Sequence, residues 1–413
     1  MAVASEIEEK LSDLRIGIIY SDVKREYFYT EAQYITEKDA YNDACVIAEE
    51  LKKLGVTPLL YPGNETLIVA LLSDQPDMVF DLVDSVNGEE YLTSTIPGIL
   101  DMIGMPYTGA GLLGLALCYN KFLTKQLMKN AMVPVPNFQL FHSPNDVIDV
   151  NLRYPLIVKL NEIHGAVEIT KDAVVENEKQ LRDRLSYLMK TYEQSVLVEE
   201  FIAGREITCM VLHGTNTKIY MAEKVFNKPD EKYVFATFDD QWINTAGNSY
   251  TYEKYEEPNL RYLVKKAFEI TKMADYGKFD VRLDSSGRYY FIDSNANPAF
   301  GPKSLTTAMG YIIQDLYNVP FSEILKRMIE NTLLDPDNQN YLHGLTSALE
   351  SANSNGGDSG SGTNYYAPMI AALNGYKNGN GTTHSTSETN DTEHYEEQPG
   401  TDRSRSTQYS SKQ

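Results

Sequence analysis

The sequence has few cysteines, no long apolar stretch and no excess of positive charge. Its 413 residues include three cysteines, Cys45, Cys118 and Cys209, each in an apolar context. Widely spaced single thiols indicate core residues of a cytoplasmic protein, which argues against a disulfide framework or a zinc site. The net charge of −21 argues against a nucleic-acid partner, because proteins that bind the phosphate backbone present basic surfaces.

Membrane and export signals are also missing. No apolar run reaches the ~20 residues that a membrane span needs, and the first stretch, MAVASEIEEKLSDLR, is acidic and lacks the apolar core of a signal peptide. We therefore expect a cytoplasmic protein without a membrane partner. The hydrophobic content of 42% allows a sizeable core, and the length allows two or three domains.

Strand and helix patterns alternate through the first hundred residues. Apolar strands are expected at 15–20, 57–61 and 78–82, and helices at 39–54, 65–72 and 95–103. This alternation predicts a parallel, doubly wound sheet. Ligands of such sheets bind beyond the carboxyl ends of the strands, where Arg25-Glu26 and Gly88-Glu89 are found.

The most informative stretch is GKFDVRLDSSGRYYFIDSNANPAFGPKS, residues 277–304. It predicts a β-hairpin with a four-residue turn at 284–287. In that register Asp280 and Asp293 are diagonal cross-strand neighbours about 7 Å apart, with Asn295 on the same side. The opposite, core face is expected to carry five apolar side chains: Phe279, Val281, Leu283, Tyr290 and Ile292.

Two carboxylates and an amide that converge in this way predict a site for a hard cation. Mg²⁺ takes oxygen ligands and completes its shell with substrate phosphates. The alternative is a solvent-facing strand pair with ordinary surface acids. Asn295, Asn297 and Pro298, directly after the second acid, favour the metal site.

This stretch resembles the metal-binding signature of ATP-grasp ligases and is most similar to the D-alanine–D-alanine ligase branch, where an acid on one strand is followed by an acid, a spacer, an Asn and a Pro. The resemblance covers about Arg15 to Leu334 and implies the ATP-grasp fold, with three α/β domains. It divides the chain into a doubly wound N-terminal substrate domain and two ATP-grasp domains, central and C-terminal, at 15–115, 116–200 and 201–340. Residues 1–14 are an N-terminal extension, and the Asn-, Gly-, Ser- and Thr-rich residues 341–413 are expected to be a disordered tail.

The resemblance implies a ligase that uses ATP and two Mg²⁺ ions, or Mn²⁺ in their place. The implied metal ligands are Asp280, Asp293 and Asn295. The implied nucleotide-binding residues are Lys121, Lys159, Glu199, Glu200, Ile202, Glu206 and Lys224. Lys121 and Lys159 would reach the phosphates and Glu206 the ribose, and residues 199–202 would form the adenine edge. The family usually has a lysine that reaches the phosphates near the position of Gln241, and Lys224 is a candidate for that role here. Taken alone, Lys159 is interpreted as a snorkelling lysine at a strand end, and Lys121 and the hairpin favour the phosphate contact.

Three further residues take catalytic positions of the family. Lys278 stands where an arginine steadies the transferring phosphoryl group, and it keeps the charge but loses the bidentate fork. Glu26 matches the acid that binds the substrate ammonium, and Ser304 matches the position that binds the acceptor carboxylate. His164 is expected to be an ordinary loop residue, because no acid or nucleophile flanks it at a fixed spacing.

The chain departs from the family at positions that shape the substrate pocket. The loop NEIHGAVEIT, residues 161–170, has Gly165 and Ala166 where the family has a Gly-Ser-Ser run, and Ala299 and Asp293 replace a glycine and a glutamate. These changes favour a ligase of a specialised pathway that joins an amino acid or related small carboxylate to an amine. A true D-alanine–D-alanine ligase and a non-catalytic nucleotide-binding protein are the alternatives. The expected partners are small molecules and, by analogy, a second copy of the chain in a homodimer.

Overall fold

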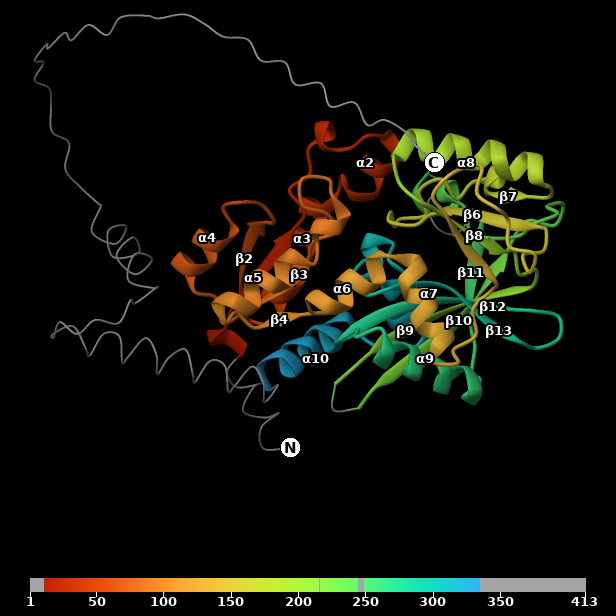
Figure 1. Cartoon of the computed structure of the whole chain (residues 1–413). Coiled ribbons are helices and arrows are strands. Elements are labelled where there is room, and N and C mark those ends of the chain that lie inside the picture. The colour runs from red at the N-terminus through yellow and green to blue at the C-terminus, as the bar shows by residue number, and fades with distance from the viewer. Residues whose placement is uncertain (1–10, 215, 244–248, 335–413) are drawn as a thin grey trace, which may run out of the picture. The chain divides into compact units, whose positions relative to one another are not determined.

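The computed structural model describes residues 11–334, except 215 and 244–248, and these residues belong to one unit, Met1–Ser351. They form three β-sheets flanked by helices (Figure 1). The predicted tail, 341–413, and most of the predicted N-terminal extension lie outside the described residues. Within the described part of the chain, no helix combines the length and the apolar character that crossing a membrane requires.

The first sheet is parallel, with the strand order β2-β1-β3-β4. Its elements are β1 (Arg15–Tyr20), α2 (Glu31–Glu37), α3 (Ala40–Lys53), β2 (Thr57–Pro62), α4 (Leu67–Asp74), β3 (Met78–Leu82), α5 (Thr95–Ile103) and β4 (Tyr107–Thr108). Neighbouring residues of β1 face opposite sides, since Ile18 packs with α3 whereas Ile19 packs with α4 and α5. The predicted doubly wound arrangement is therefore confirmed.

The second sheet is antiparallel, with the order β5-β8-β6-β7. Two helices lead into it, α6 (Leu112–Tyr119) and α7 (Lys121–Asn130), and they are followed by β5 (Phe138–Phe141), β6 (Leu156–Leu160), β7 (Val174–Val175), α8 (Glu178–Tyr192) and β8 (Val196–Glu200). Leu181, Leu185 and Leu188 of α8 pack in one core with Leu156 and Val158 of β6. Asn120 begins α7, because its side chain accepts a hydrogen bond from the backbone N–H of Leu123 at 3.0 Å.

The third sheet is also antiparallel, with the order β11-β10-β9-β12-β13. Its elements are β9 (Arg205–Leu212), β10 (Lys218–Phe226), β11 (Tyr250–Lys254), α9 (Pro258–Ile270), β12 (Tyr276–Leu283) and β13 (Tyr289–Asn295). Val264 of α9 packs with Ile207 and Phe279 on one face of this sheet. The opposite face carries charged side chains. The last helix, α10 (Phe321–Leu334), returns to the first sheet and lies beside β4 and α3 (Figure 1).

Candidate functional site

The hairpin of β12 and β13 brings the two predicted metal-binding acids directly opposite each other. Asp280 pairs with Asp293, and Lys278 pairs with Asn295. The register shifts beside Asp280, because Ile292 is an extra, bulged residue in β13. The two carboxylates and the amide share one face as expected, but the acids are direct and not diagonal neighbours.

The core face of β13 also differs from the predicted one. Phe291, and not Tyr290 or Ile292, points into the core, where it is buried against the ring of Phe279 with the ring centroids 5.6 Å apart. The strand pairs one residue later than predicted, so that Phe291 lies opposite Val281, and the extra residue Ile292 then reverses the alternation. Asp293 returns to the face of Asp280 only because of this reversal.

The predicted turn was one residue too short. Leu283 pairs with Tyr289, so that residues 284–288 connect the strands. The carboxylate of Asp284 holds the longer connection, because it accepts hydrogen bonds from the backbone N–H groups of Ser286 and Arg288, each at 2.9 Å. Such Asx contacts compete with the shorter hairpin turns.

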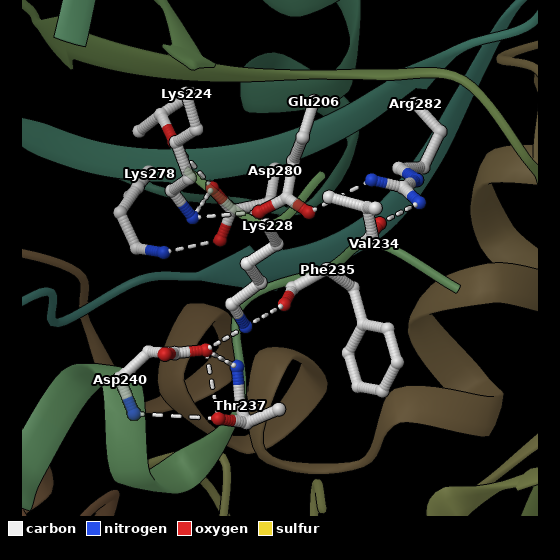
Figure 2. Close-up of polar contacts among 11 residues, drawn as sticks. Glu206, Lys224, Lys228, Val234, Phe235, Thr237, Asp240, Lys278, Asp280 and Arg282 are labelled. Atoms are coloured by element: carbon white, nitrogen blue, oxygen red, sulfur yellow. Dashed lines mark hydrogen bonds and ion pairs between the residues drawn. The ribbon is translucent and has the colours of Figure 1, made fainter. Parts of the chain in front are cut away.

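Charged side chains form a row across the third sheet, shown in Figure 2. Glu206 of β9 lies opposite both Lys224 of β10 and Arg282 of β12. Its carboxylate accepts hydrogen bonds from Lys224 Nζ at 2.8 Å and Arg282 Nη1 at 3.1 Å. All three are buried, so each needs a partner of opposite charge. The sequence places Arg282 on this face by its spacing of two from Asp280, but no role was predicted for it.

Asp280 accepts hydrogen bonds from three side chains. Thr208 Oγ1 lies 2.7 Å and Lys224 Nζ 3.3 Å from its Oδ1, and Lys278 Nζ binds Oδ2 (Figure 2). Burial raises the pKa of Asp280, but Lys224 and Lys278 outweigh burial and hold the pKa below its usual range. Burial likewise lowers the pKa of Lys224, but Asp280 and Glu206 raise it well above the usual value. The site therefore holds an ionised carboxylate between two ammonium groups.

Asp293 has a different environment from its neighbour. Its half-buried carboxylate lines a cavity and makes no hydrogen bond or ion pair with any residue that the structure describes. Burial raises its pKa, but Lys121 and Lys278 more than offset this and lower the pKa below the usual value. An ionised carboxylate with free oxygens that faces a cavity suits a hard cation.

The surrounding donors fit Mg²⁺ only together with oxygens from a substrate. Among the residues of 11–334 that the structure describes, no group of three His, Cys, Asp or Glu side chains could hold a metal ion by itself. A cation here would have two carboxylates and the amide of Asn295, whose Oδ1 accepts a hydrogen bond from the backbone N–H of Asn297 at 2.9 Å. Mg²⁺ commonly binds through one or two carboxylates plus phosphates.

Lysines from α7 and β6 surround Glu199, which is completely buried. Lys125 Nζ lies 3.0 Å and Lys159 Nζ 3.2 Å from its two carboxylate oxygens. Lys121, one helical turn before Lys125, hydrogen-bonds to the carbonyl of Ile163 and has a pKa that burial lowers. Lys125 was missed in the sequence, although a spacing of four on a helix places it on the same face as Lys121.

The loop of residues 161–170 is fixed by contacts with distant segments. The backbone N–H of His164 donates to Glu90, and His164 Nδ1 lies 2.8 Å from Glu90 Oε2. Trp242 Nε1 donates to the carbonyl of Gly165 at 2.7 Å. His164 is therefore more than the ordinary loop residue that the sequence predicted, because it joins this loop to the region that follows β3.

A cavity of about 780 Å³ is lined by the acids of the hairpin, by Lys121 and Lys159, and by part of the loop of residues 161–170. Every predicted site residue except Glu26 lines it: Lys121, Lys159, Glu199, Glu200, Ile202, Glu206, Lys224, Lys278, Asp280, Asp293, Asn295 and Ser304. Ala299 and Trp242 line it as well. The structure thus brings together residues that lie up to 183 positions apart in the chain, from Lys121 to Ser304.

The predicted ammonium-binding acid is the exception. Glu26 is exposed in a short 3-10 helix, residues 25–27, and does not line the cavity. Glu37, at the end of α2, lines the cavity instead; it is 7% exposed and accepts a hydrogen bond from Ser85 Oγ at 2.6 Å. Burial and the nearby Asp84 raise the pKa of Glu37 to about 8. The sequence reading missed Glu37 because it did not predict α2.

Glu37→Gln is expected to remove a pH dependence of stability. The unfolded chain loses this proton near pH 4.5 and the folded chain near pH 8, so unfolding releases a proton between these values and stability falls as the pH rises. We expect the variant to be more stable than wild type at pH 8, by up to about 4 kcal/mol, and equally stable at pH 4.5. Urea unfolding at both pH values measures this, with exposed Glu65→Gln as the control. The same difference at both pH values would contradict the assignment.

Comparisons with known proteins agree with this geometry. Residues 127–330 match the family described as D-ala D-ala ligase C-terminus. The protein y4sG of Sinorhizobium fredii, itself uncharacterized, is 28% identical over 280 residues, 65% of this chain and 80% of that protein. D-alanine–D-alanine ligase B of Chromobacterium violaceum is 29% identical over 276 residues, 65% of this chain and 88% of that enzyme. The crystal structure of the Bacillus anthracis D-alanine–D-alanine ligase complexed with ATP matches with a TM-score of 0.57 at 20% identity, and the match covers 78% of this chain and 97% of that one.

The parallel sheet, the two antiparallel sheets and the match to the solved ligase define an ATP-grasp fold. The chain has this fold and is similar in sequence to D-alanine–D-alanine ligases, so the resemblance drawn from residues 277–304 is confirmed.

Proposed function

We propose that the protein is an ATP-dependent, ADP-forming ligase that joins a carboxylate to an amine. The observation that carries the proposal is one cavity in which Lys121, Lys159 and Lys278 lie with the opposed acids Asp280 and Asp293. A triphosphate requires cations of this kind, and its divalent ion requires such acids. The relatives named D-alanine–D-alanine ligase, and the related solved structure that contains ATP, support the same class of reaction.

In this proposal the nucleotide lies against the end of β8. Glu200 and Ile202 would offer backbone groups to the adenine and Glu206 a carboxylate to the ribose, whereas Lys121 and Lys159 would contact the phosphates. Glu199 would contribute only backbone atoms, because its side chain is buried between two lysines.

Asp280, Asp293 and Asn295 would hold Mg²⁺, which supplies charge neutralisation to the phosphates when it is bound. Lys278 places an ammonium group beside the same acids and would steady the transferring phosphoryl group. Lys224 would act indirectly, since its ammonium group forms hydrogen bonds with Glu206 and Asp280 within the sheet.

The proposed reaction has two steps. A carboxylate oxygen attacks the γ-phosphorus of ATP, the bond from that phosphorus to the β,γ-bridging oxygen breaks, and ADP leaves. The amine nitrogen then attacks the carbonyl carbon of the acyl phosphate, and the carbon–nitrogen bond forms as the carbon–oxygen bond to phosphate breaks. The amine loses a proton, and inorganic phosphate leaves with one oxygen of the original carboxylate.

For the substrates, we propose that Glu37 takes the role predicted for Glu26 and binds an ammonium group. Glu37 reaches the cavity and Glu26 does not. Ser304, which is exposed to the cavity, would bind the acceptor carboxylate. The domain boundaries, the homodimer and the cytoplasmic location expected from the sequence stay predictions.

D-alanine is expected to be a poor substrate in both positions. The family's loop serine is replaced by Gly165 and Ala166, and a site that loses a buried hydrogen-bond partner loses roughly 1–3 kcal/mol for each unmet group. Ala299 adds a methyl group that faces the cavity. We expect at least about tenfold slower ADP release with D-alanine than with the best pair from a panel of L-amino acids, glycine, dipeptides and bulkier carboxylates.

The panel also tests the second candidate, a true D-alanine–D-alanine ligase, which the names of several relatives favour. Efficient formation of D-alanyl-D-alanine, with no better pair in the panel, would establish that candidate. Absence of ADP release with every pair, in a protein that still binds ATP, would instead indicate a non-catalytic nucleotide-binding protein.

A further inference from the structure

Lys125 is a buried lysine that the proposed reaction does not use. It lies in α7 and is 4% exposed. Its Nζ atom lies 3.0 Å from a carboxylate oxygen of Glu199, 3.2 Å from the carbonyl oxygen of Phe291 and 3.2 Å from that of Ile292. Two of the three ammonium donors form hydrogen bonds with these carbonyls, and the contact with Glu199 is an ion pair.

The two carbonyl acceptors belong to the bulge of β13. Carbonyls of successive residues in a regular strand point in opposite directions, so that one donor cannot reach both. At the bulge, Phe291 still pairs with Val281, Ile292 is extra, and both carbonyls reach the same nitrogen. Asp293 is the next residue, and its return to the face of Asp280 depends on this extra residue.

We infer that Lys125 is a positioning residue that holds the β13 bulge and thereby keeps Asp293 on the metal-binding face. Without it, the buried carbonyl of Phe291 loses its side-chain donor and the carbonyl of Ile292 keeps only Lys159, and a slip of one residue would turn Asp293 away from Asp280. Lys159 cannot replace it, because its Nζ donates to the carbonyl of Ile292, whereas among the described side chains Lys125 is the donor to the carbonyl of Phe291. The inference rests on the proposed metal role of Asp293.

The experiment compares Lys125→Met with Lys129→Met, an exposed lysine one turn further along the same helix. Mn²⁺ binding in the presence of ADP is measured by electron paramagnetic resonance. We expect Lys125→Met to weaken Mn²⁺ binding about tenfold or more, the usual cost of losing a residue that orients a metal ligand. ADP affinity without metal, followed by the fluorescence of Trp242, the only tryptophan, should change less than threefold. Lys129→Met should match wild type in both measurements.

Lys125→Arg separates the two contacts of Lys125. The variant keeps a positive charge beside Glu199 and is expected to stay folded, but its planar fork cannot present one nitrogen to both carbonyls. We expect Mn²⁺ binding to weaken about threefold or more, and this variant decides the question if Lys125→Met does not fold. If the folded Lys125 variants bind Mn²⁺ as tightly as wild type while Asp293→Asn binds it more weakly, this inference is wrong and the proposed metal site stands. Wild-type Mn²⁺ affinity in Asp293→Asn would overturn the proposed metal site and this inference with it.

Discussion

Asp293→Asn is expected to lower ATP turnover by at least about 100-fold, the usual cost of losing one strong electrostatic contact to a transferring group. The asparagine keeps the shape of the side chain but removes the only carboxylate of the hairpin pair that has no hydrogen bond or ion pair among the described residues. Its core neighbours Phe279 and Phe291 are untouched, so the free energy of unfolding should fall by no more than about 1–2 kcal/mol.

Turnover is measured as ADP release at saturating ATP and Mg²⁺, and stability by urea unfolding of the same preparations. Asp230→Asn is the matched control, since Asp230 is exposed and does not line the cavity. Turnover of Asp293→Asn close to that of the control would refute the metal assignment.

Glu199→Gln is expected to destabilise the fold by about 3–5 kcal/mol, because it leaves two buried lysines without their counter-charge. Glu199 is completely buried, and both of its oxygens lie within 3.2 Å of an ammonium nitrogen, that of Lys125 or Lys159. A loss of this size is a large fraction of the 5–15 kcal/mol that holds a typical domain together.

The adjacent residue offers the control. Glu200 is only half-buried, and its carboxylate accepts hydrogen bonds from Asn137 and from the backbone N–H of Arg153. Glu200→Gln should therefore cost about 1 kcal/mol. Equal urea midpoints for the two variants would show that the lysines do not depend on Glu199.

The local sequence pattern was sufficient to predict those elements whose side chains follow one regular period from end to end. The strands at 15–20 and 78–82 begin and end as predicted, because four consecutive buried residues in each leave little ambiguity. Most of the candidate site was also predictable, since Asp280, Asp293 and Asn295 lie within one hairpin. The helix α8 was not predicted, although Leu181, Leu185 and Leu188 have helical spacing.

The remaining features depend on contacts between distant residues. The bulge at Ile292 is held by Lys125, which lies 167 positions earlier, and no local pattern signals it. His164 gains its role through distant partners, chiefly Glu90, 74 positions away. Glu26 and Glu37 are both acids after the first strand, and only the packed structure shows which of them faces the cavity.

The central claim, that a carboxylate is activated by phosphorylation in this cavity, can be tested by following oxygen. The protein is incubated with ATP, Mg²⁺ and a pool of amino acids whose carboxyl groups carry ¹⁸O, and the released phosphate is analysed by mass spectrometry. The account predicts ADP and inorganic phosphate that carries one ¹⁸O atom, because the acyl phosphate passes a carboxylate oxygen to phosphate. Release of unlabelled phosphate in step with amide formation, or of AMP and pyrophosphate, would contradict it.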